Sequence, residues 1–391
     1  MKRTRLAVVL ALAAAAMALG GCKTLFQNLG RKDNVEPPTP LAQPFSPSLD
    51  VQRLWTAKPN NGAGNSGARL RPAVVDGRLY VAGTDGTVQA LDAANGRSLW
   101  SVRDKKQHWS GGPAANGDFV VVGSLDGSLH AFAADDGSPR WQSRINAEVI
   151  TAPAIGDGLV AVRAQNGRLF GIDLADGSRK WVYEQAVPAL SLRGNSAPLI
   201  VGDLVVNGYD SGRLVAVRAA DGALAWTQML ANAEGRTEVE RLADVDGAVV
   251  ADGNEVFAAG YRGQIGAFQA ESGRPTWGRD ISSHAGVAVN ADAVVVSDSE
   301  GNVWAFDRRN GANLWKQDGL LHRWLTAPAL IGNHAVVGDL EGWVHWLDLG
   351  DGRVVARARL GKQRIESTPV VADGVVYVLD VEGHIGAWRA P

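Results

Sequence analysis

The sequence predicts an all-β protein, an eight-bladed β-propeller, and three observations support this prediction. A unit of roughly forty residues recurs from about Arg71 to the end of the 391-residue chain. Short apolar runs within each unit alternate with the period of a half-buried strand, as in Leu79 and Val81. Dipeptides such as Asp85-Gly86 separate these runs, and Gly readily adopts the positive φ of a tight hairpin turn. Four short strands in such a unit form one propeller blade.

The first residues of the chain have the features of a secretory signal peptide. Basic residues within the first five positions precede an apolar, Ala-rich run from Leu6 to Leu19. This run is too short to span a bilayer comfortably, and a basic start followed by a short apolar run is typical of a segment that is removed after export. We therefore predict a signal peptide over residues 1–21.

The end of the apolar run, Leu19-Gly20-Gly21-Cys22, resembles the bacterial lipoprotein box. Small residues there let the signal peptidase reach the bond before the cysteine, so Cys22 is the predicted lipidation site. Cys22 is the only cysteine, which excludes an internal disulfide. Lipoproteins of this kind are retained at the inner membrane by Asp at the next position, where this chain has Lys23. The resemblance thus implies an anchor in the outer membrane on its periplasmic face; the alternative is an ordinary signal peptide with an incidental cysteine.

Residues 22–50 are predicted to be the lipidated cysteine and a tether. Five prolines between positions 37 and 47 discourage regular structure and favour extended chain. A fully extended tether of this kind reaches roughly 80 Å, at about 3.1 Å per residue.

Eight copies of the repeat are predicted between residues 51 and 391. Most copies place a proline before their first apolar run, at positions 72, 113, 153, 198, 328 and 369, whereas the fifth has Ala248 and the sixth departs near Gly286. The eighth copy lacks its last strand, and a spare strand with a tryptophan lies around Val51 to Trp55. Pairing this N-terminal strand into the last blade would close the ring, remove an exposed edge and make residues 51–391 one domain.

A tryptophan recurs near the end of most copies, and it has two interpretations. It stands at positions 100, 141, 181, 226, 277 and 315. A large ring on the outer strand could pack between blades, or it could stack on a ligand. Residues repeated around a ring cannot all face one ligand, and the seventh copy has Ala356 instead. We therefore predict a packing role, with a burial contribution of roughly 2–3 kcal/mol each.

Charge and composition exclude several classes of function. Without the signal peptide the chain has 36 basic and 41 acidic residues, a net charge of −5, and no basic stripe that would favour nucleic acid. The histidines lack metal-ligand spacing, and the glycine-rich stretch 61–67 lacks the Lys-Ser/Thr of a phosphate loop. Asp244-Val-Asp246-Gly247 begins like a calcium loop, but the remaining ligand positions do not follow. We predict no catalytic residue, cofactor or metal.

Two long connections between blades are the predicted binding segments, because loops on a rigid scaffold concentrate binding residues. In the first, between positions 181 and 197, Leu190 and Leu192 provide apolar anchors and Arg193 a planar fork for carboxylates or carbonyls. In the second, between positions 226 and 248, Asp244 and Asp246 either orient Arg193 or meet basic groups on a partner. The alternative is that both segments only cover blade ends, with Arg193 tied internally to a carboxylate.

The repeat also carries a family resemblance. The pattern Ala-x-Asp-xxx-Gly-xxx-Trp, clearest over residues 90–100 and 305–315, is similar to the docking motif of pyrroloquinoline-quinone (PQQ) enzymes, which many propellers share without binding the quinone. Longer stretches resemble the BamB family, the lipoprotein propellers of the outer-membrane β-barrel assembly machinery, and this similarity covers nearly the whole chain. These stretches are residues 188–198, 237–246, 320–328 and 337–346.

The resemblance implies a non-enzymatic scaffold of the Bam complex. It implies binding of the periplasmic POTRA region of the barrel-forming subunit BamA, together with other Bam subunits, and a role in assembly and insertion of outer-membrane β-barrels. The partner-binding residues that it implies are Leu190, Leu192, Arg193, Asp244 and Asp246. Unfolded outer-membrane proteins are possible clients, which blade edges could receive as an added strand.

The sequence is also compatible with two other functions. A periplasmic PQQ-dependent alcohol or sugar dehydrogenase would share the docking motif. However, no set of an Asp base, calcium-binding carboxylates and a stacking Trp can be assembled over one pocket, and the chain is shorter than such enzymes. A scaffold with a different partner, such as peptidoglycan or another envelope complex, is the other alternative.

Overall fold

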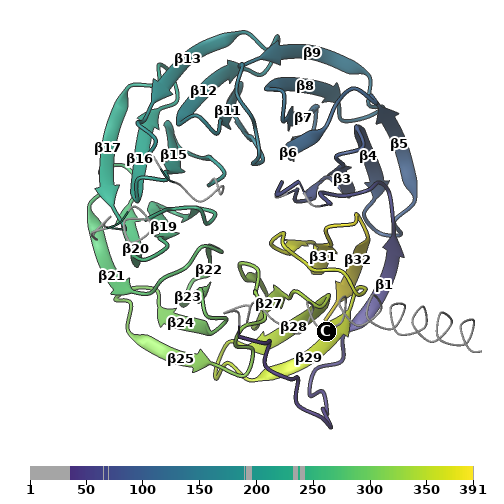
Figure 1. Ribbon diagram of the computed structural model, residues 1–391, viewed down its shortest axis with the longest axis vertical. Coiled ribbons are helices and arrows are strands. Elements are labelled where there is room, and N and C mark those ends of the chain that lie inside the picture. The colour runs from purple at the N-terminus through teal and green to yellow at the C-terminus, as the bar shows by residue number, and fades with distance from the viewer. Residues whose placement is uncertain are drawn as a thin grey trace, which may run out of the picture. The chain divides into compact units, whose positions relative to one another are not determined.

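The computed structural model describes residues 36–64, 66–68, 70–188, 190, 196–231, 237 and 243–390. The chain divides into two units, Met1–Pro38 and Thr39–Pro391. All strands among the described residues lie in the second unit, where they form eight four-stranded antiparallel sheets arranged radially around a central axis (Figure 1). No helix within the described residues is long and apolar enough to cross a membrane.

Each sheet is one blade, and strand order along the chain follows the blade from the axis outward. Blade one contains β2 (Ala73–Val75), β3 (Arg78–Ala82), β4 (Thr87–Asp92) and β5 (Ser98–Arg103), and blade two contains β6 (Trp109–Ala115), β7 (Phe119–Ser124), β8 (Ser128–Ala133) and β9 (Pro139–Arg144). Blade three contains β10 (Ala154–Gly156), β11 (Leu159–Arg163), β12 (Arg168–Asp173) and β13 (Arg179–Glu184), and blade four contains β14 (Leu199–Val201), β15 (Leu204–Gly208), β16 (Arg213–Arg218) and β17 (Leu224–Met229). Blade five contains β18 (Val250–Asp252), β19 (Glu255–Ala259), β20 (Gln264–Gln269) and β21 (Pro275–Asp280). Blade six contains β22 (Val287–Val289), β23 (Ala293–Ser297), β24 (Val303–Asp307) and β25 (Asn313–Gln317). Blade seven contains β26 (Ala329–Ile331), β27 (His334–Gly338), β28 (Trp343–Asp348) and β29 (Val354–Arg359). Blade eight contains β30 (Val370–Ala372), β31 (Val375–Leu379) and β32 (Ile385–Arg389), completed by β1 (Gln52–Ala57).

The predicted ring closure is confirmed. β1 pairs antiparallel with β32, with Trp55 opposite Ala387 and Ala57 opposite Ile385. The N-terminal strand thereby becomes the outer strand of the last blade, which completes the eight-bladed all-β fold that the sequence predicts. In blade five the strand register places Val249, rather than Ala248, at the position of the repeated proline.

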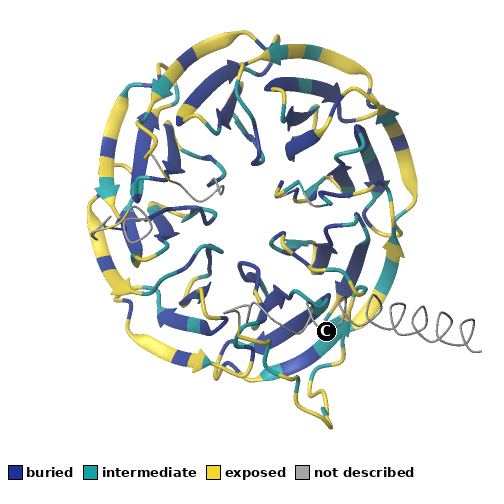
Figure 2. Cartoon of the chain, in the orientation of Figure 1, coloured by how far each residue is buried: buried dark blue, intermediate teal, exposed yellow. Residues whose placement is uncertain are grey.

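The burial of each strand explains the pattern of apolar and polar residues in the repeat. The middle strands of a blade pack against neighbouring blades on both faces, and strands such as β11 and β15 are buried along their whole length. The outer strands are largely exposed and bury one main residue, as β17 buries Trp226 (Figure 2). As a result, the middle strands of a blade have continuous apolar runs, whereas the outer strands alternate between exposed and less exposed residues.

The recurring tryptophans hold neighbouring blades together, which confirms the packing interpretation. Trp181 donates from Nε1 to the carbonyl of Ala219 in the next blade at 2.7 Å. Its ring covers Gly222, where φ is +72° and an added Cβ would lie 2.7 Å from a ring carbon. The same Trp–Gly contact occurs at seven blade junctions, formed by Trp55–Gly96, Trp100–Gly137, Trp141–Gly177, Trp181–Gly222, Trp226–Gly273, Trp277–Gly311 and Trp315–Gly352.

The junction between blades seven and eight is built differently. Its outer strand has Ala356 in place of the tryptophan, and blade eight takes its outer strand from β1, so it has no glycine turn that could receive a ring. Leu49 and Val51 pack instead against the cluster that contains Ala356 and Trp388. The backbone amides of residues 48 and 49 donate to the carbonyl of Val355 at 2.9 and 3.2 Å.

The chain before β1 lies along blade seven within the second unit. Thr39 donates its backbone amide to the carbonyl of Leu321 at 3.0 Å, and the Arg357 guanidinium lies 4.0 Å from the Phe45 ring centroid. Residues 39–50, which the sequence analysis places in the tether, thus contact the propeller.

Candidate functional site

The blade-to-blade connections gather on one face of the propeller. Because the four strands of a blade alternate in direction, each outer strand ends on the face where the next innermost strand begins. The turns between the second and third strands lie on this same face. We call it the connection face; it contains both connections that the sequence singles out.

The first connection runs from β13 to β14. Leu190 is 42 % exposed on it, as an apolar anchor requires. Leu192 and Arg193 lie outside the described residues, and so does the predicted lipidation site Cys22. Ser196, which is 1 % exposed, donates from Oγ to the carbonyl of Gly247 at 3.0 Å. This hydrogen bond ties the first connection to the second, beside Asp246.

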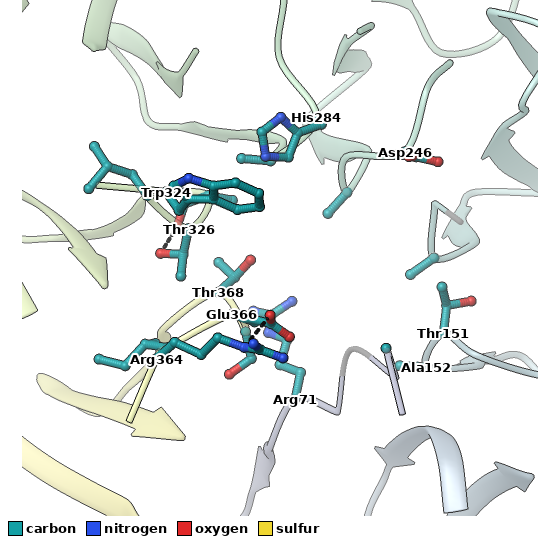
Figure 3. Close-up of a pocket in the computed structure, with 18 of the residues that line it drawn as sticks. Arg71, Thr151, Ala152, Asp246, His284, Trp324, Thr326, Arg364, Glu366 and Thr368 are labelled. Carbon is teal, nitrogen blue, oxygen red and sulfur yellow. Dashed lines mark hydrogen bonds and ion pairs between the residues drawn. The ribbon is translucent and has the colours of Figure 1, made fainter. Parts of the chain in front are cut away.

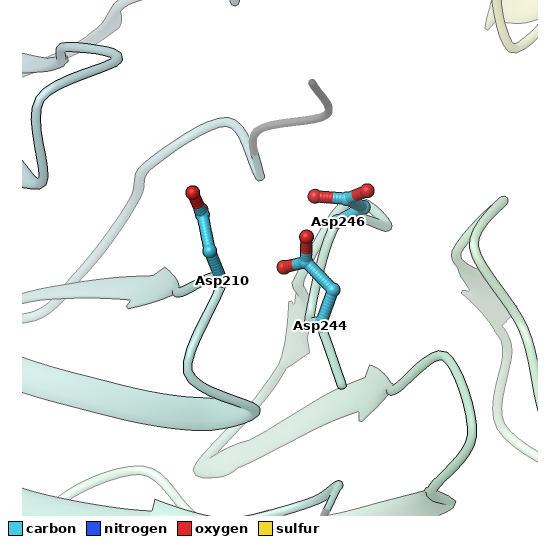
Figure 4. A group of neighbouring side chains, drawn as sticks. All are labelled: Asp210, Asp244 and Asp246. Atoms are coloured by element: carbon cyan, nitrogen blue, oxygen red, sulfur yellow. The ribbon is translucent and has the colours of Figure 1, made fainter. Parts of the chain in front are cut away.

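The second connection places two acidic residues next to a third from a neighbouring turn. Asp210, Asp244 and Asp246 are 4 %, 2 % and 3 % exposed. They offer carboxylate oxygens within 4.8 Å of one another (Figure 4). Tyr261 donates its backbone amide to the carbonyl of Asp244 at 2.7 Å, which fixes the connection against blade five. Asp244 and Asp246 are therefore interior groups and do not present their carboxylates at the surface.

Arg163, at the end of β11, is a buried cation next to this acid cluster. Its Nη2 donates to Asp210 Oδ1 at 3.2 Å, both side chains are buried, and the guanidinium lies 4.6 Å from the Tyr209 ring centroid. Burial, together with the charges of Asp246 and Asp210, raises the pKa of Asp244 to about 10. With this pKa, Asp244 keeps its proton at neutral pH.

Sequence reasoning missed Asp210 and Arg163. Neither lies within a local motif around positions 244–247, because strand topology, rather than sequence spacing, brings them together. One signal was present in the repeats themselves. By register, Arg163 occupies the position of Gly123 in blade two, Gly208 in blade four and Ala259 in blade five. The other blades have a small residue or, in blade eight, Leu379 at this position, so a charged residue marks a local departure from the blade pattern.

The protonation of Asp244 gives the protein a stability that depends on pH. The folded-state pKa lies above the ordinary value near 3.8, so the folded chain binds this proton more tightly than the unfolded chain. The resulting stabilisation is complete below the unfolded pKa and is lost as pH rises toward about 10. We expect the free energy of unfolding, from urea titrations, to fall between pH 6 and pH 9. Asp244→Asn is expected to reduce this slope; equal slopes in both proteins would contradict the assignment.

A cavity of about 620 Å³ opens near the axis, lined by residues of the blade-to-blade connections (Figure 3). Asp246 belongs to its wall, so the acid cluster and the cavity are adjacent. The cavity also contains an ion pair between Arg364 Nε and Glu366 Oε1 at 2.7 Å.

Fold and site together define a closed, eight-bladed propeller of PQQ-like repeats whose candidate binding residues lie on the connection face. A family model described as outer membrane protein assembly factor BamB matches residues 50–108 and 84–317. The chain belongs to the BamB family.

Relatives and solved structures agree with this assignment. BamB of Xanthomonas campestris pv. campestris is 41 % identical over 387 residues, which cover 95 % of each chain. BamB of Escherichia coli is 35 % identical over 376 residues, covering 94 % of this chain and 95 % of that one. The crystal structure of BamB from Moraxella catarrhalis superimposes with a TM-score of 0.79 at 28 % identity, covering 87 % of this chain and all of that chain. A quinohemoprotein alcohol dehydrogenase from Comamonas testosteroni reaches a TM-score of 0.69 at 14 % identity, which is a likeness of fold alone.

Proposed function

We propose that the protein is a non-enzymatic lipoprotein scaffold of the outer-membrane β-barrel assembly complex, which aids the assembly and insertion of β-barrel proteins. The observation that carries this proposal is the match to outer membrane protein assembly factors, at up to 41 % identity, over nearly the whole chain. The dehydrogenase alternative has no support beyond a common fold.

The proposed location is the periplasmic face of the outer membrane, with Cys22 as the lipid-bearing residue and residues 1–21 as the removed signal peptide. The Lys at position 23 favours the outer membrane over retention at the inner membrane. The chain that links Cys22 to the propeller unit is the proposed tether.

The proposed partner is the POTRA region of BamA, contacted by Leu190, Leu192 and Arg193 on the connection face. The exposure of Leu190 supports a direct contact. The burial of Asp244 and Asp246 favours an indirect role, in which the Asp246 carboxylate and the protonated Asp244 carboxyl group orient Arg193 from beneath. The hydrogen bond from Ser196 to Gly247 supports this arrangement, because it anchors the chain three residues after Arg193 beside the acid cluster. A guanidinium is also the group that buried carboxylates favour as a partner.

The test is binding of the full chain, purified in detergent, to the periplasmic region of BamA from the same organism. Arg193→Ala is expected to weaken binding roughly thirtyfold or more, since a hot-spot arginine contributes on the order of 2 kcal/mol. Arg179→Ala is the matched control, because Arg179 is an exposed residue of the outer strand β13 and lies away from the connection. Its affinity should equal that of the unmodified protein.

A second variant separates contact from folding. Leu190 is exposed and lies outside the acid cluster, so Leu190→Ala should weaken binding while leaving the melting temperature unchanged. Absence of binding by the unmodified chain would discard BamA as the partner. Normal binding by both the Arg193 and Leu190 variants would keep the partner and discard the site.

A further inference from the structure

We propose that the central cavity is a binding site in which Arg71 holds the carboxylate of an apolar ligand, such as the end or an acidic side chain of a peptide. The proposal goes beyond the function proposed above, because it concerns a ligand held at the axis and is tested without BamA. It follows from a comparison of the repeats with one another.

Arg71 stands at a position that the other blades fill with small residues. It lies two residues before Ala73, the first paired residue of β2. By the same register, five equivalents are alanine, blade two has a glycine and blade eight a threonine. The alanines are Ala152, Ala197, Ala248, Ala285 and Ala327, which all line the cavity with Arg71. The blade therefore needs only a small residue here, and the arginine is a local exception.

Packing and pairing do not explain this exception. Arg71 is exposed to the cavity and forms no hydrogen bond or ion pair with any described residue. Arg71 is open to the cavity, and desolvation by the protein around it lowers the pKa of its guanidinium. The other arginine of the wall, Arg364, is already neutralised by Glu366. A cation that is partly removed from water and has no partner gains most from an incoming anion.

A second polar group of the wall also lacks a partner. Thr151 is 5 % exposed, and its buried Oγ1 has no hydrogen-bond partner among the described residues. Because this oxygen has almost no accessible surface, it faces the surrounding protein and does not reach the open cavity, which leaves Arg71 as the group that would hold a ligand. Figure 3 shows Arg71 beside Arg364 and Glu366, and Thr151 beside Ala152 on another part of the wall.

The charges of the wall select a singly charged anion. Glu366 pairs with Arg364, and Asp246 is a second carboxylate of the wall. A dianion such as phosphate would therefore carry an uncompensated charge close to two carboxylates. One carboxylate, bound by the planar fork of Arg71, restores neutrality around that guanidinium.

The rest of the wall indicates an apolar ligand body. Trp324 is 67 % exposed, although it is a large aromatic residue, and its backbone has φ of +51°, a conformation that is strained for a residue with a Cβ. Leu325, Leu340 and Ile365 line the same cavity. Its volume of about 620 Å³ is that of a small-molecule site, large enough for a short peptide segment.

The experiment titrates three small probes into the full chain in detergent and follows their acetyl signals by saturation-transfer NMR. N-acetyl-alanyl-leucine has a terminal carboxylate, N-acetyl-aspartyl-leucine amide has a side-chain carboxylate, and N-acetyl-alanyl-leucine amide is neutral. We expect at least one of the carboxylates to bind and the neutral amide to bind at least tenfold more weakly. Comparison of the two carboxylates distinguishes a chain end from an acidic side chain as the natural source.

Arg71→Ala installs the residue that five other blades use, so it is expected to fold with an unchanged or higher melting temperature. It should weaken carboxylate binding tenfold to a hundredfold, the range that corresponds to a charged hydrogen bond. The matched control is the double variant Arg364→Gln with Glu366→Gln, which removes an ion pair from the same wall without changing net charge. It should bind within about threefold of the unmodified chain.

Three results would overturn the proposal: no binding of either carboxylate, equal binding of the neutral amide, or unchanged carboxylate binding in folded Arg71→Ala. None of them depends on BamA. Loss of BamA binding in the Arg193 variant and loss of probe binding in the Arg71 variant are therefore separate outcomes.

Discussion

Arg323→Met is expected to lower the free energy of unfolding by about 3–5 kcal/mol, because it leaves a buried carboxylate without its main counter-charge. Arg323 and Asp339 are 2 % and 0 % exposed, and Arg323 Nε donates to Asp339 Oδ2 at 2.7 Å. A second guanidinium nitrogen pairs with Glu341, and the third donates to the carbonyl of Thr39 at 2.9 Å. All three nitrogens of this side chain are thus used.

Asp339 remains charged in the interior because several donors point at it. Burial raises its pKa, but the hydrogen bond from His345 at 2.9 Å, the backbone amide of Trp343 and the charge of Arg323 lower it further, so the net shift is downward. Burial lowers the pKa of His345, which is therefore a neutral hydrogen-bond donor to Asp339. Arg323 is then the full positive charge that balances Asp339.

A second substitution tests this account. Asp339→Asn keeps an oxygen for the backbone amides of residues 341 and 343 but removes the charge. Added to Arg323→Met, it is expected to recover at least about 1 kcal/mol, although alone it destabilises. Urea titrations of the four proteins measure the coupling, and purely additive losses would contradict it. Hydrogen exchange at the Thr39 amide should also accelerate in Arg323→Met, since that arginine holds the carbonyl of the same residue.

The sequence predicts the propeller because a repeated fold repeats its local rules. The Trp–Gly junction explains why even the two copies that depart from the repeat fit the predicted fold. A tryptophan at position 356 would need a glycine turn in blade eight, and that turn is absent because β1 supplies the outer strand. The missing tryptophan of copy seven and the missing strand of copy eight are therefore two consequences of one closure.

The candidate site was less accessible to sequence reasoning. Leu190 could be proposed from its place in a long connection, and it is exposed. The burial of Asp244 and Asp246 could not be foreseen, because it depends on the neighbouring turn that contributes Asp210. Arg163 and Arg71 were visible in principle, as charged residues at positions that the other blades fill with uncharged ones. Reading eight copies as an internal alignment detects such exceptions, whereas reading motifs one at a time does not.

Gly222→Ala is expected to destabilise the protein by about 3–4 kcal/mol, whereas Gly374→Ala should cost only about 1–2 kcal/mol. Both glycines have nearly the same backbone, with φ of +72° and +71°, so both substitutions carry the same left-handed strain. They differ in surroundings: a Cβ at Gly374 meets nothing within 4 Å, whereas one at Gly222 lies 2.7 Å from the Trp181 ring. The difference of about 2 kcal/mol is the expected cost of overpacking.

The ring of Trp181 cannot retreat to relieve this contact, because its Nε1 is held by the carbonyl of Ala219 at 2.7 Å. In a Trp181→Ala background the new Cβ at position 222 meets no ring. The destabilisation caused by Gly222→Ala should then fall to that caused by Gly374→Ala. The same penalty in both backgrounds, measured by urea titration, would mean that backbone strain alone explains why the glycine turns recur in the blades. The coupled result would establish that each blade's glycine turn is shaped by the tryptophan of the blade before it, so that a blade of this propeller is complete only with its neighbour.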